Sequence, residues 1–200
     1  MARARAEDYA KKQQRIRDRA AELFAARGFE ATSAADIAAE GGFSKALIYH
    51  YFTSKEEILQ DLLEAHMDAL LAAAEASLRE SDEPRTRMRA FVRAHMRIYA
   101  KSRAKHLLLI NELNSLPARG RAAIVAKQGR LIGLAADLFA DIAPALKARP
   151  ELRFPTAMSF YGMINWTCMW YRPNGHLSPD QFADLACNLF LGGLVTTFAA

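Results

Sequence analysis

The chain is organised around residues 33–55, which read SAADIAAEGGFSKALIYHYFTSK. Ser33, followed three residues later by Asp36, predicts a capping box that starts one short helix, and Ser44 predicts the cap of a second. The glycine pair 41–42 between them predicts a sharp turn, because glycine adopts positive φ without steric cost. Two short helices joined by a tight turn are typical of a helix-turn-helix, whose second helix enters the major groove of DNA. The segment therefore predicts a DNA-binding head.

The rest of the 200-residue chain also has the pattern of helices. Hydrophobic residues make up 52% of it, which is enough for a real core. They recur at helical spacing, and no stretch alternates with a period of two. The expected helices span about 9–27, 34–40, 45–51, 54–79, 84 to beyond 99, 107–113, 117 until Pro144 or Pro150 stops the pattern, 155–171, and a last one that opens at 178–179. The chain is predicted to be all-α.

The same patterns predict local features of these helices. Ser54 with Glu57, and Ser178 with Gln181, predict two more capping boxes. Phe29 is predicted to be a core residue beneath the head. The apolar face of the helix that starts at 84 is predicted to carry Met88, Phe91, Val92, His95, Met96 and Tyr99.

Much of the basic excess lies before the quoted segment. The formal net charge is +5, and residues 1–20 hold seven cations, Arg3 and Arg5 among them, against three anions. An uneven positive charge suits an anionic partner such as DNA. We therefore expect residues 1–20 to act as an arm against the DNA backbone or minor groove, and a solvated tail is an equal alternative.

Other function classes lack their signatures. The polar N-terminus does not resemble a signal peptide, and the apolar stretch 182–200 is interrupted by Asp184 and Asn188, which argues against a membrane span. Cys168 and Cys187 form no CxxC pair, so both are predicted to be reduced core thiols of a cytoplasmic protein. No HExxH, GxSxG or P-loop motif is present, so we expect no catalytic residues, no metal and no cofactor.

Several spaced motifs resemble the head of the TetR family of repressors. They are Phe29-Glu30-Ala31-Thr32-Ser33 with Ile37-Ala38, then Gly42-Phe43-Ser44-Lys45, Ile48-Tyr49-His50-Tyr51-Phe52 and Ser54-Lys55-Glu56-Glu57. The resemblance covers about residues 10–60. It implies a three-helix DNA-binding head at residues 1–53 and a C-terminal helical domain at residues 54–200 that binds a small effector and forms a homodimer.

The second helix of the head offers few positions that can reach bases. Its N-terminal end carries Ser44, Lys45, Ala46 and Leu47. Lys45 can donate to guanine, while Ala46 and Leu47 can pack on a thymine methyl. Ile48 and Phe52 are predicted to be core.

Phosphate contacts are predicted for the hydroxyl, aromatic and basic side chains that flank this end, namely Thr32, Ser33, Tyr49, His50, Tyr51 and Lys55. The resemblance matches Tyr49, Tyr51 and Lys55 to backbone-contact positions of the family. Packing between helices is the alternative for Tyr49, and a solvated side chain is the alternative for Lys55.

A second resemblance concerns the effector. Residues Asn165-Trp166-Thr167-Cys168-Met169-Trp170-Tyr171-Arg172-Pro173-Asn174-Gly175, followed by Leu177-Ser178-Pro179, are similar to a branch of the family that senses acyl-coenzyme A thioesters. Such a ligand needs a flat surface for adenine, which Trp166 or Trp170 can supply, and a cation for phosphate, which Arg172 can supply. The other predicted ligand-binding residues are Met96, Tyr99, Arg103 and His106. The alternative for both tryptophans is dimer or core packing, and for the methionine it is plain core.

The last two helices are predicted to form the dimer interface. Leu185 and Leu189, with the small residues Ala186, Gly192 and Gly193, permit close helix contact across a two-fold axis. Phe190 and Leu194 are expected to contribute to the same surface.

These features together predict a ligand-responsive transcriptional regulator. We expect a dimer that represses from a palindromic operator and is released by an acyl-coenzyme A thioester of fatty-acid, steroid or aromatic-acid breakdown. The alternative effector is a hydrophobic drug-like or aromatic molecule. An enzyme and a DNA binder that ignores sequence are the competing classes, and activation instead of repression stays open.

Overall fold

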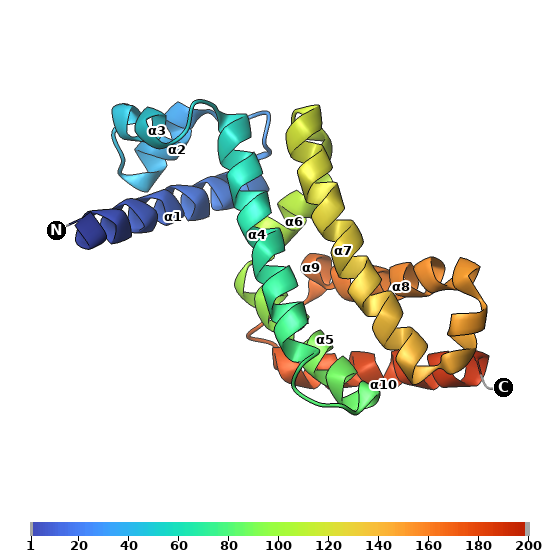
Figure 1. The fold of residues 1–200 in the computed structure, drawn as a ribbon. Helices are drawn as coiled ribbons and strands as arrows, with labels where there is room; N and C mark the ends of the chain where they lie inside the picture. The colour runs from blue at the N-terminus through green and yellow to red at the C-terminus, as the bar shows by residue number, and fades with distance from the viewer. Residues whose placement is uncertain (1, 199–200) are drawn as a thin grey trace. The chain divides into compact units, whose positions relative to one another are not determined.

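The described chain is built of helices. The structure, a computed structural model, describes the backbone of residues 2–198 and the side chains of residues 7–198, and no strand occurs in that range. Its elements are α1 (Ala2–Arg27), α2 (Ala34–Gly41), α3 (Lys45–Tyr51), α4 (Lys55–Ser77), α5 (Pro84–Lys101), α6 (Arg103–Asn111), η1 (Leu113–Ser115), α7 (Ala118–Ile142), η2 (Pro144–Ala148), α8 (Pro150–Asn165), α9 (Thr167–Trp170) and α10 (Pro179–Thr197) (Figure 1). The prediction of an all-α chain is confirmed.

The elements form two compact units. The first comprises Met1–His66 with Ala104–Ile124, and the second comprises Met67–Arg103 with Val125–Ala200. The first unit thus holds α1 to α3, the first half of α4 and most of α6, whereas the second holds α5, α8, α9 and α10. The predicted boundary after residue 53 follows the end of the helix-turn-helix, so it does not coincide with the division between the units.

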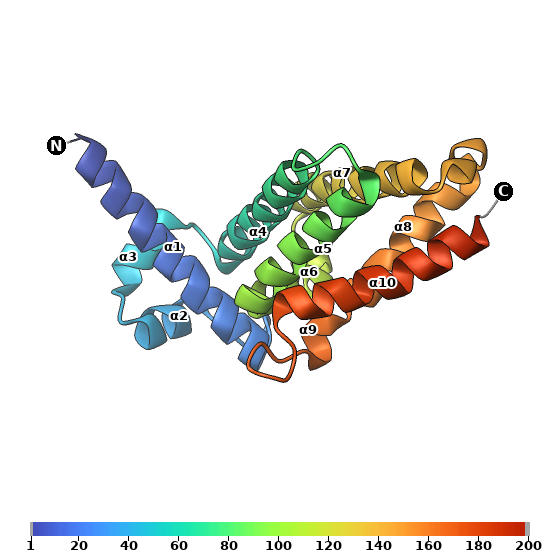
Figure 2. The same cartoon turned by 90° about the horizontal axis from the view of Figure 1, so that it is seen from below.

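The helix-turn-helix packs on the first helix. In both ribbon views α2 and α3 lie side by side, and α2 rests on α1 (Figures 1 and 2). The large apolar side chains buried among them are Ile16, Phe24, Phe29, Ile37, Ile48 and Phe52. This confirms the predicted core positions Phe29, Ile48 and Phe52.

The predicted local signals of the helix-turn-helix are present. The Ser33 hydroxyl accepts from the Asp36 N–H at 3.2 Å while the Asp36 carboxylate accepts from the Ser33 N–H at 2.8 Å, which is a complete capping box. Gly42 ends α2 in the left-handed region with φ of 66°. The Ser44 hydroxyl accepts from the Leu47 N–H at 3.0 Å and starts α3.

The capping box predicted at Ser54 and Glu57 is only half formed. The Ser54 hydroxyl accepts from the Glu57 N–H at 3.2 Å, as predicted. The Glu57 carboxylate, however, accepts from the Thr53 hydroxyl at 2.6 Å and the Thr53 N–H at 2.5 Å. Thr53 offers two donors where the Ser54 backbone offers one. The Thr53 hydroxyl and N–H together lower the pKa of Glu57 below its ordinary value.

Polar side chains join α5 to α10 in the second unit. Figure 2 shows the two helices side by side. Arg93 forms a bidentate pair with Asp184 at 2.9 and 2.7 Å, and Arg97 pairs with Asp180 one turn along. One turn the other way, Arg89 donates to the Asn188 side chain at 2.9 Å. The opposite face of α5 is buried, as predicted, through Met88, Phe91, Val92, His95, Met96 and Tyr99.

The aromatic helix predicted at 155–171 is wrong in its extent. It begins at Pro150, so Pro155 lies inside α8, and it breaks at Trp166 before the single turn of α9. At the break the Thr167 hydroxyl donates to the Ile164 carbonyl at 2.6 Å, a local bond that competes with helix continuation. The helix predicted at 107–113 is likewise shifted: α6 ends at Asn111, and Leu113 belongs to η1.

Both cysteines are buried thiols, which confirms their predicted core placement. Burial raises the pKa of Cys187 to about 12. Within the described residues, no helix combines the length and apolar character needed to cross a membrane.

Candidate functional site

The N-terminal end of α3 is open to solvent, as a base-reading surface requires. Ser44, Lys45 and Ala46 are exposed, and Leu47 is half-buried. The next side chain, Ile48, is buried and anchors the helix from beneath. Three of the four predicted base-contacting positions are thus presented, while Leu47 offers only part of its side chain.

The aromatic side chains of α3 lie on the exposed part of the helix and at its end. Tyr49 is 50% exposed, which argues against the alternative that it is packed between helices. Its ring lies 6.0 Å from Lys45 Nζ. His50 is exposed, and Tyr51 is half-buried with its ring 4.4 Å from that of Tyr9 on α1. Tyr9 is 43% exposed and was not predicted as a site residue, although an aromatic residue in an otherwise polar segment was a usable signal.

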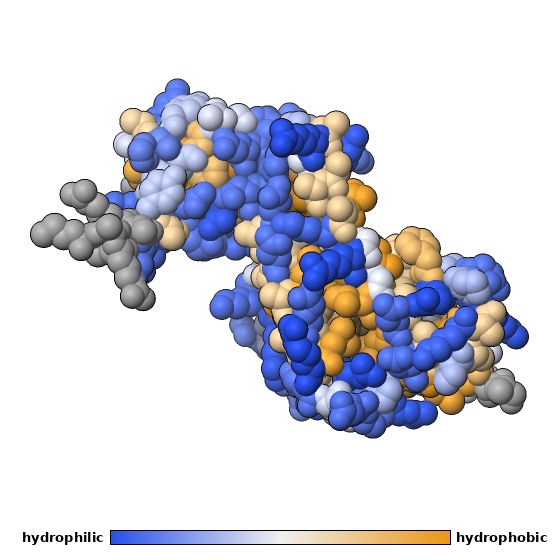
Figure 3. All heavy atoms as spheres, in the orientation of Figure 1, coloured by the Kyte–Doolittle hydropathy of each residue, from blue (hydrophilic) through white to orange (hydrophobic). Residues whose placement is uncertain are grey.

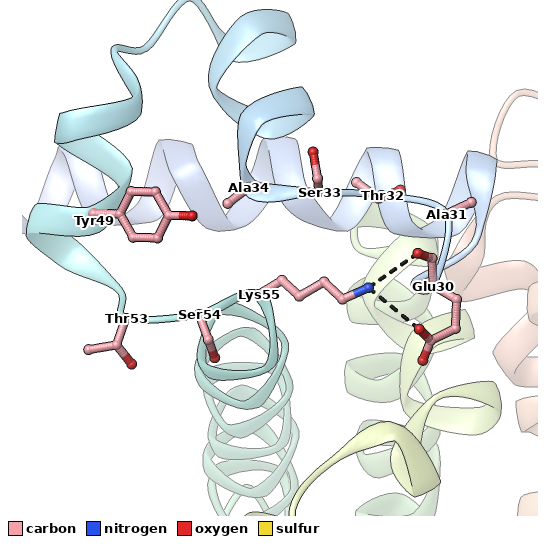
Figure 4. A pocket seen from close by; sticks show the side chains of 9 residues that line it. All are labelled: Glu30, Ala31, Thr32, Ser33, Ala34, Tyr49, Thr53, Ser54 and Lys55. Atoms are coloured by element: carbon pink, nitrogen blue, oxygen red, sulfur yellow. Dashed lines mark hydrogen bonds and ion pairs between the residues drawn. The ribbon is translucent and has the colours of Figure 1, made fainter.

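A hollow opens beside α3, shown in Figure 4, where two helices begin. Its lining includes Ser33, which caps α2, and Ser54, which precedes the first residue of α4. Tyr49 and Thr53 line it as well. Helix N-termini carry unpaired N–H groups and partial positive charge, so the wall of this hollow suits a phosphate.

Lys55, at the start of α4, is not a solvated side chain. Its Nζ donates to the Phe29 and Glu30 carbonyls at 3.0 and 3.3 Å and lies 3.6 Å from the Glu30 carboxylate (Figure 4). It also lies 4.4 Å from the centre of the Phe29 ring. The alternative of a solvated lysine is therefore wrong, because the ammonium already holds the turn after α1.

The predicted phosphate contact by the Thr32 side chain is wrong. Thr32 is only 1% exposed, and its hydroxyl donates to the Gly28 carbonyl at 2.8 Å. Gly28 has φ of 90° and ends α1, so the Thr32 hydroxyl stabilises this turn. Ser33, next along the chain, is exposed and remains a candidate.

The residues predicted to bind an effector do not form one site. His106 belongs to the first unit, where its Nδ1 lies 3.4 Å from His66 Nε2, whereas the other predicted ligand residues belong to the second. His106 is buried, and its role in effector binding stays a prediction. Met96 is fully buried.

Two of the remaining residues meet at a small cavity. Tyr99 and Arg103 line it together with Thr167, Cys168 and Tyr171. Arg103 Nε donates to the Cys168 carbonyl at 2.7 Å. The cavity measures about 10 Å³, room for roughly one water molecule.

Both tryptophans are on the surface. Trp166 is 64% exposed and Trp170 is 51% exposed, so core packing, one of the two alternatives, is wrong for them. The Trp170 and Phe182 rings are steeply inclined to each other, with their centres 5.4 Å apart. Arg172 is exposed in the loop that follows. A flat ring and a cation are therefore available near each other in sequence and accessible to solvent.

Exposed apolar residues occur on both α8 and α10, which pack on each other. On α10, Leu185, Leu189, Gly192 and Gly193 are all exposed, whereas Phe190 turns inward onto the Phe139 ring at 4.8 Å and Leu194 is buried. The prediction for Leu194 is wrong because its side chain is buried, whereas Phe190 is half-buried and its interface role stays a prediction. On α8 the exposed apolar residues are Phe154 and Met158, one turn apart, followed by Trp166 just beyond the helix. Sequence reasoning missed Phe154, although its spacing to the other two was visible.

Apolar surface is also exposed between α4 and α7 of the second unit, in the space-filling view of Figure 3. Ion pairs bridge the two helices there: Lys127 Nζ to Asp68 at 2.6 Å, and Arg130 to Glu75 at 2.5 Å. Among the described side chains, no cluster of three or more His, Cys, Asp and Glu could hold a metal ion.

An exposed recognition helix flanked by helix N-termini, in a chain with a second helical unit, defines a DNA-binding regulator of the helix-turn-helix class. The family described as bacterial regulatory proteins, tetR family, matches residues 16–62, and the one described as tetracyclin repressor-like, C-terminal domain, matches residues 81–194, more than half of the chain. The chain belongs to the TetR family of transcriptional regulators.

Individual relatives agree with this assignment. The HTH-type transcriptional repressor KstR2 of Mycobacterium tuberculosis (strain ATCC 25618 / H37Rv) is 28% identical over 179 residues, 88% of each chain. A TetR-family transcriptional regulator from Bordetella parapertussis 12822 is 41% identical, with a TM-score of 0.86 over 90% of this chain and 93% of that one. AibR, crystallised with isovaleryl coenzyme A and operator DNA, is 27% identical, with a TM-score of 0.74 over 93% of this chain and 97% of that one.

Proposed function

We propose that the protein is a homodimeric repressor of a near-palindromic operator that an acyl-coenzyme A thioester releases. The head, residues 1–53, would read DNA, and residues 54–200 would bind the effector and the second subunit. The observation that carries the DNA-binding part is the exposed end of α3 beside the hollow at the starts of α2 and α4. In this proposal Lys45 would read a base, and Ser33, Tyr49 and Thr53 would hold phosphates.

The proposed dimer is supported by the exposed apolar residues of α8 and α10. Leu189 is 65% exposed and Phe154 is 60% exposed, and clusters of exposed apolar side chains are typical of protein interfaces. Each head alone makes few contacts, so two heads on half-sites one helical turn apart, or a multiple of it, would supply the affinity. The operator should therefore be a near-palindrome.

The effector class is supported by Trp170 and Arg172, which are accessible and close in sequence, and by the coenzyme A thioester named with AibR. The cavity near Tyr99 is too small for an acyl chain, so binding would require the second unit to open. The exposed apolar surface between α4 and α7 would be a point of entry (Figure 3).

Selection from random DNA tests the first part, with a single enriched palindrome as the expected result. A collection without a shared sequence would instead favour a binder that ignores sequence. Fluorescence anisotropy on the selected DNA then tests release by isovaleryl- and hexanoyl-coenzyme A against free coenzyme A and the free acids. Release by the thioesters alone supports the effector class, and release by hydrophobic aromatic compounds alone contradicts it. Arg172→Ala should weaken the thioester effect and leave DNA binding unchanged, with Arg149→Ala as the matched surface control.

A further inference from the structure

His95 is buried in the second unit with one ring nitrogen unpaired. It lies on α5, and none of its surface is exposed. Nδ1 lies 2.8 Å from the Phe91 carbonyl, and since a carbonyl only accepts, Nδ1 carries the hydrogen. Nε2 is then a bare acceptor. It has no hydrogen-bond partner among the described residues.

The surroundings of His95 keep the ring neutral. Aromatic rings of Phe91, Tyr99 and Tyr161 lie with their centres 4.3, 5.9 and 5.9 Å from that of the imidazole. Burial lowers the pKa of His95 to about 4, only partly offset by the bond to Phe91. The ring is therefore uncharged near neutral pH, and its open nitrogen has a lone pair to offer.

The nearby tyrosine hydroxyls use their hydrogens elsewhere. Tyr99 donates to the Asn165 side chain at 2.7 Å, and Tyr161 donates to the Leu131 carbonyl at 3.3 Å. Tyr99, one helical turn beyond His95, also lines the small cavity at α9. The acceptor thus lies one turn from existing space, inside an otherwise apolar core.

The unpaired acceptor limits which chemical groups of a ligand can bind beside His95. A carbonyl or carboxylate would face the lone pair of His95 with another acceptor, and a buried ammonium would lose its hydration without a counter-charge. A neutral donor such as a hydroxyl is complementary. Because an unpaired buried acceptor is unfavourable, a ligand hydroxyl there would gain more than its contact area alone provides.

We propose that His95 Nε2 accepts a hydrogen bond from a hydroxyl on the apolar part of the effector, so that the protein distinguishes hydroxylated acyl groups from saturated and keto ones. The inference rests on the proposed function, in which the second unit binds the effector. It adds the chemical class of the acyl group and the residue that reads it.

The test compares coenzyme A thioesters of one chain length by calorimetry on the full-length protein. Hexanoyl-, 3-hydroxyhexanoyl-, 6-hydroxyhexanoyl- and 3-oxohexanoyl-coenzyme A are the probes. One hydroxylated thioester should bind about tenfold more tightly than hexanoyl-coenzyme A, the ratio that one net hydrogen bond gives, and the oxo compound should bind no more tightly. Equal affinities for all four would overturn the inference.

Three variants assign the preference to His95. His95→Leu removes the acceptor, so the affinities for the hydroxylated thioester and for hexanoyl-coenzyme A should become about equal. His95→Gln, whose amide oxygen can accept, should retain part of the preference. Ser77→Ala is the control, since Ser77 is a buried residue of the second unit whose hydroxyl already donates to the Ala74 carbonyl at 2.7 Å. It should leave the ratio unchanged. A tenfold preference that persists in His95→Leu would contradict the assignment.

A different result is expected if only the proposed effector class is wrong. In that case no thioester binds, and the role of His95 is tested with two small apolar molecules, cyclohexanol, which carries a hydroxyl, and methylcyclohexane, which does not. Cyclohexanol should give the larger thermal shift and move the ¹⁵N resonance of His95 Nε2, and His95→Leu should abolish the difference. Equal thermal shifts, or an Nε2 resonance that no probe moves, would overturn the inference.

Discussion

Lys105 Nζ lies 2.6 Å from Asp18 Oδ1, an ion pair that joins α6 to α1 within the first unit. Two residues earlier, Arg103 Nε donates to the Cys168 carbonyl of α9 in the second unit. The first turn of α6 therefore carries one contact to the head and one to the proposed effector region. If the proposed effector moves α9, we expect the continuous chain of α6 to carry that movement to the pair between Lys105 and Asp18.

We expect Lys105→Ala to weaken the response to effector more than it weakens DNA binding. The pair is partly exposed, so its loss should cost no more than about 1 kcal/mol of stability. Operator affinity should change by less than about threefold, while the factor by which hexanoyl-coenzyme A reduces that affinity should fall by about threefold or more. Operator titrations with and without effector measure both. Lys147→Ala, which removes a surface pair with Asp141, should leave the factor unchanged.

Lys45→Ala and Tyr49→Phe should separate base reading from phosphate contact. Lys45→Ala is expected to cost about 1–3 kcal/mol of discrimination at one base pair, because its contact is to a base edge. Tyr49→Phe removes one hydroxyl donor and should cost about 0.5–1.5 kcal/mol on every sequence alike. Binding to the selected operator and to its single-base variants measures the two patterns. If both variants lost affinity in the same way across the single-base operator variants, the assignment of Lys45 to a base and Tyr49 to a phosphate would be wrong.

Gly42→Ala and Gly129→Ala should have opposite effects on stability. Gly42 has φ of 66°, where an L side chain is strained, so alanine should destabilise the protein by about 1–2 kcal/mol although no atom lies within 4 Å of the new Cβ. Gly129 lies within α7 with equally open space and ordinary φ, so alanine should stabilise by about 0.4–1 kcal/mol. Urea unfolding measures both. If both variants changed the free energy of unfolding in the same direction, the left-handed conformation of Gly42 would not be the cause.

Stability should fall in acid through His95. Its pKa is about 4 in the folded protein and about 6.5 in an unfolded chain, so the unfolded state takes up the proton first. The contribution of the neutral ring is complete above about pH 6.5 and is lost as pH falls towards 4, by about 3 kcal/mol in total. His95→Leu should lack this loss. The difference between the two pH profiles isolates His95, since every other buried histidine is present in both proteins.

Leu189→Glu should convert the proposed dimer to a monomer. It places a charge on the exposed apolar face of α10, and burying that charge without a partner in an interface is costly. Sedimentation should show half the mass, and operator affinity should fall by more than tenfold because the two heads are uncoupled. Leu177→Glu is the control, since Leu177 is 40% exposed but lies in the loop before α10. If Leu177→Glu also sedimented as a monomer, the loss of the dimer would have to be attributed to unfolding and not to the α10 face.

Local sequence determined the helix-turn-helix. The capping boxes at Ser33 and Ser178, the left-handed turn at Gly42 and the buried face of α5 depend on residues within one or two turns of each other, so spacing alone predicted them. The exposed end of α3 followed from the same reasoning, because the core positions Ile48 and Phe52 fix which side of the helix faces outward.

Only the tertiary structure decided the rest, since it depends on partners far away in sequence. It buried the Thr32 hydroxyl beneath the turn at Gly28, left Trp166 on the surface, and turned His106 into the core of the other unit. The pairing of Arg93 with Asp184 joins positions 91 residues apart, which no local pattern encodes. The unpaired nitrogen of His95 also depends on tertiary packing. The sequence predicts that the residue lies on an apolar face, but only packing determines which of its two nitrogens lacks a partner.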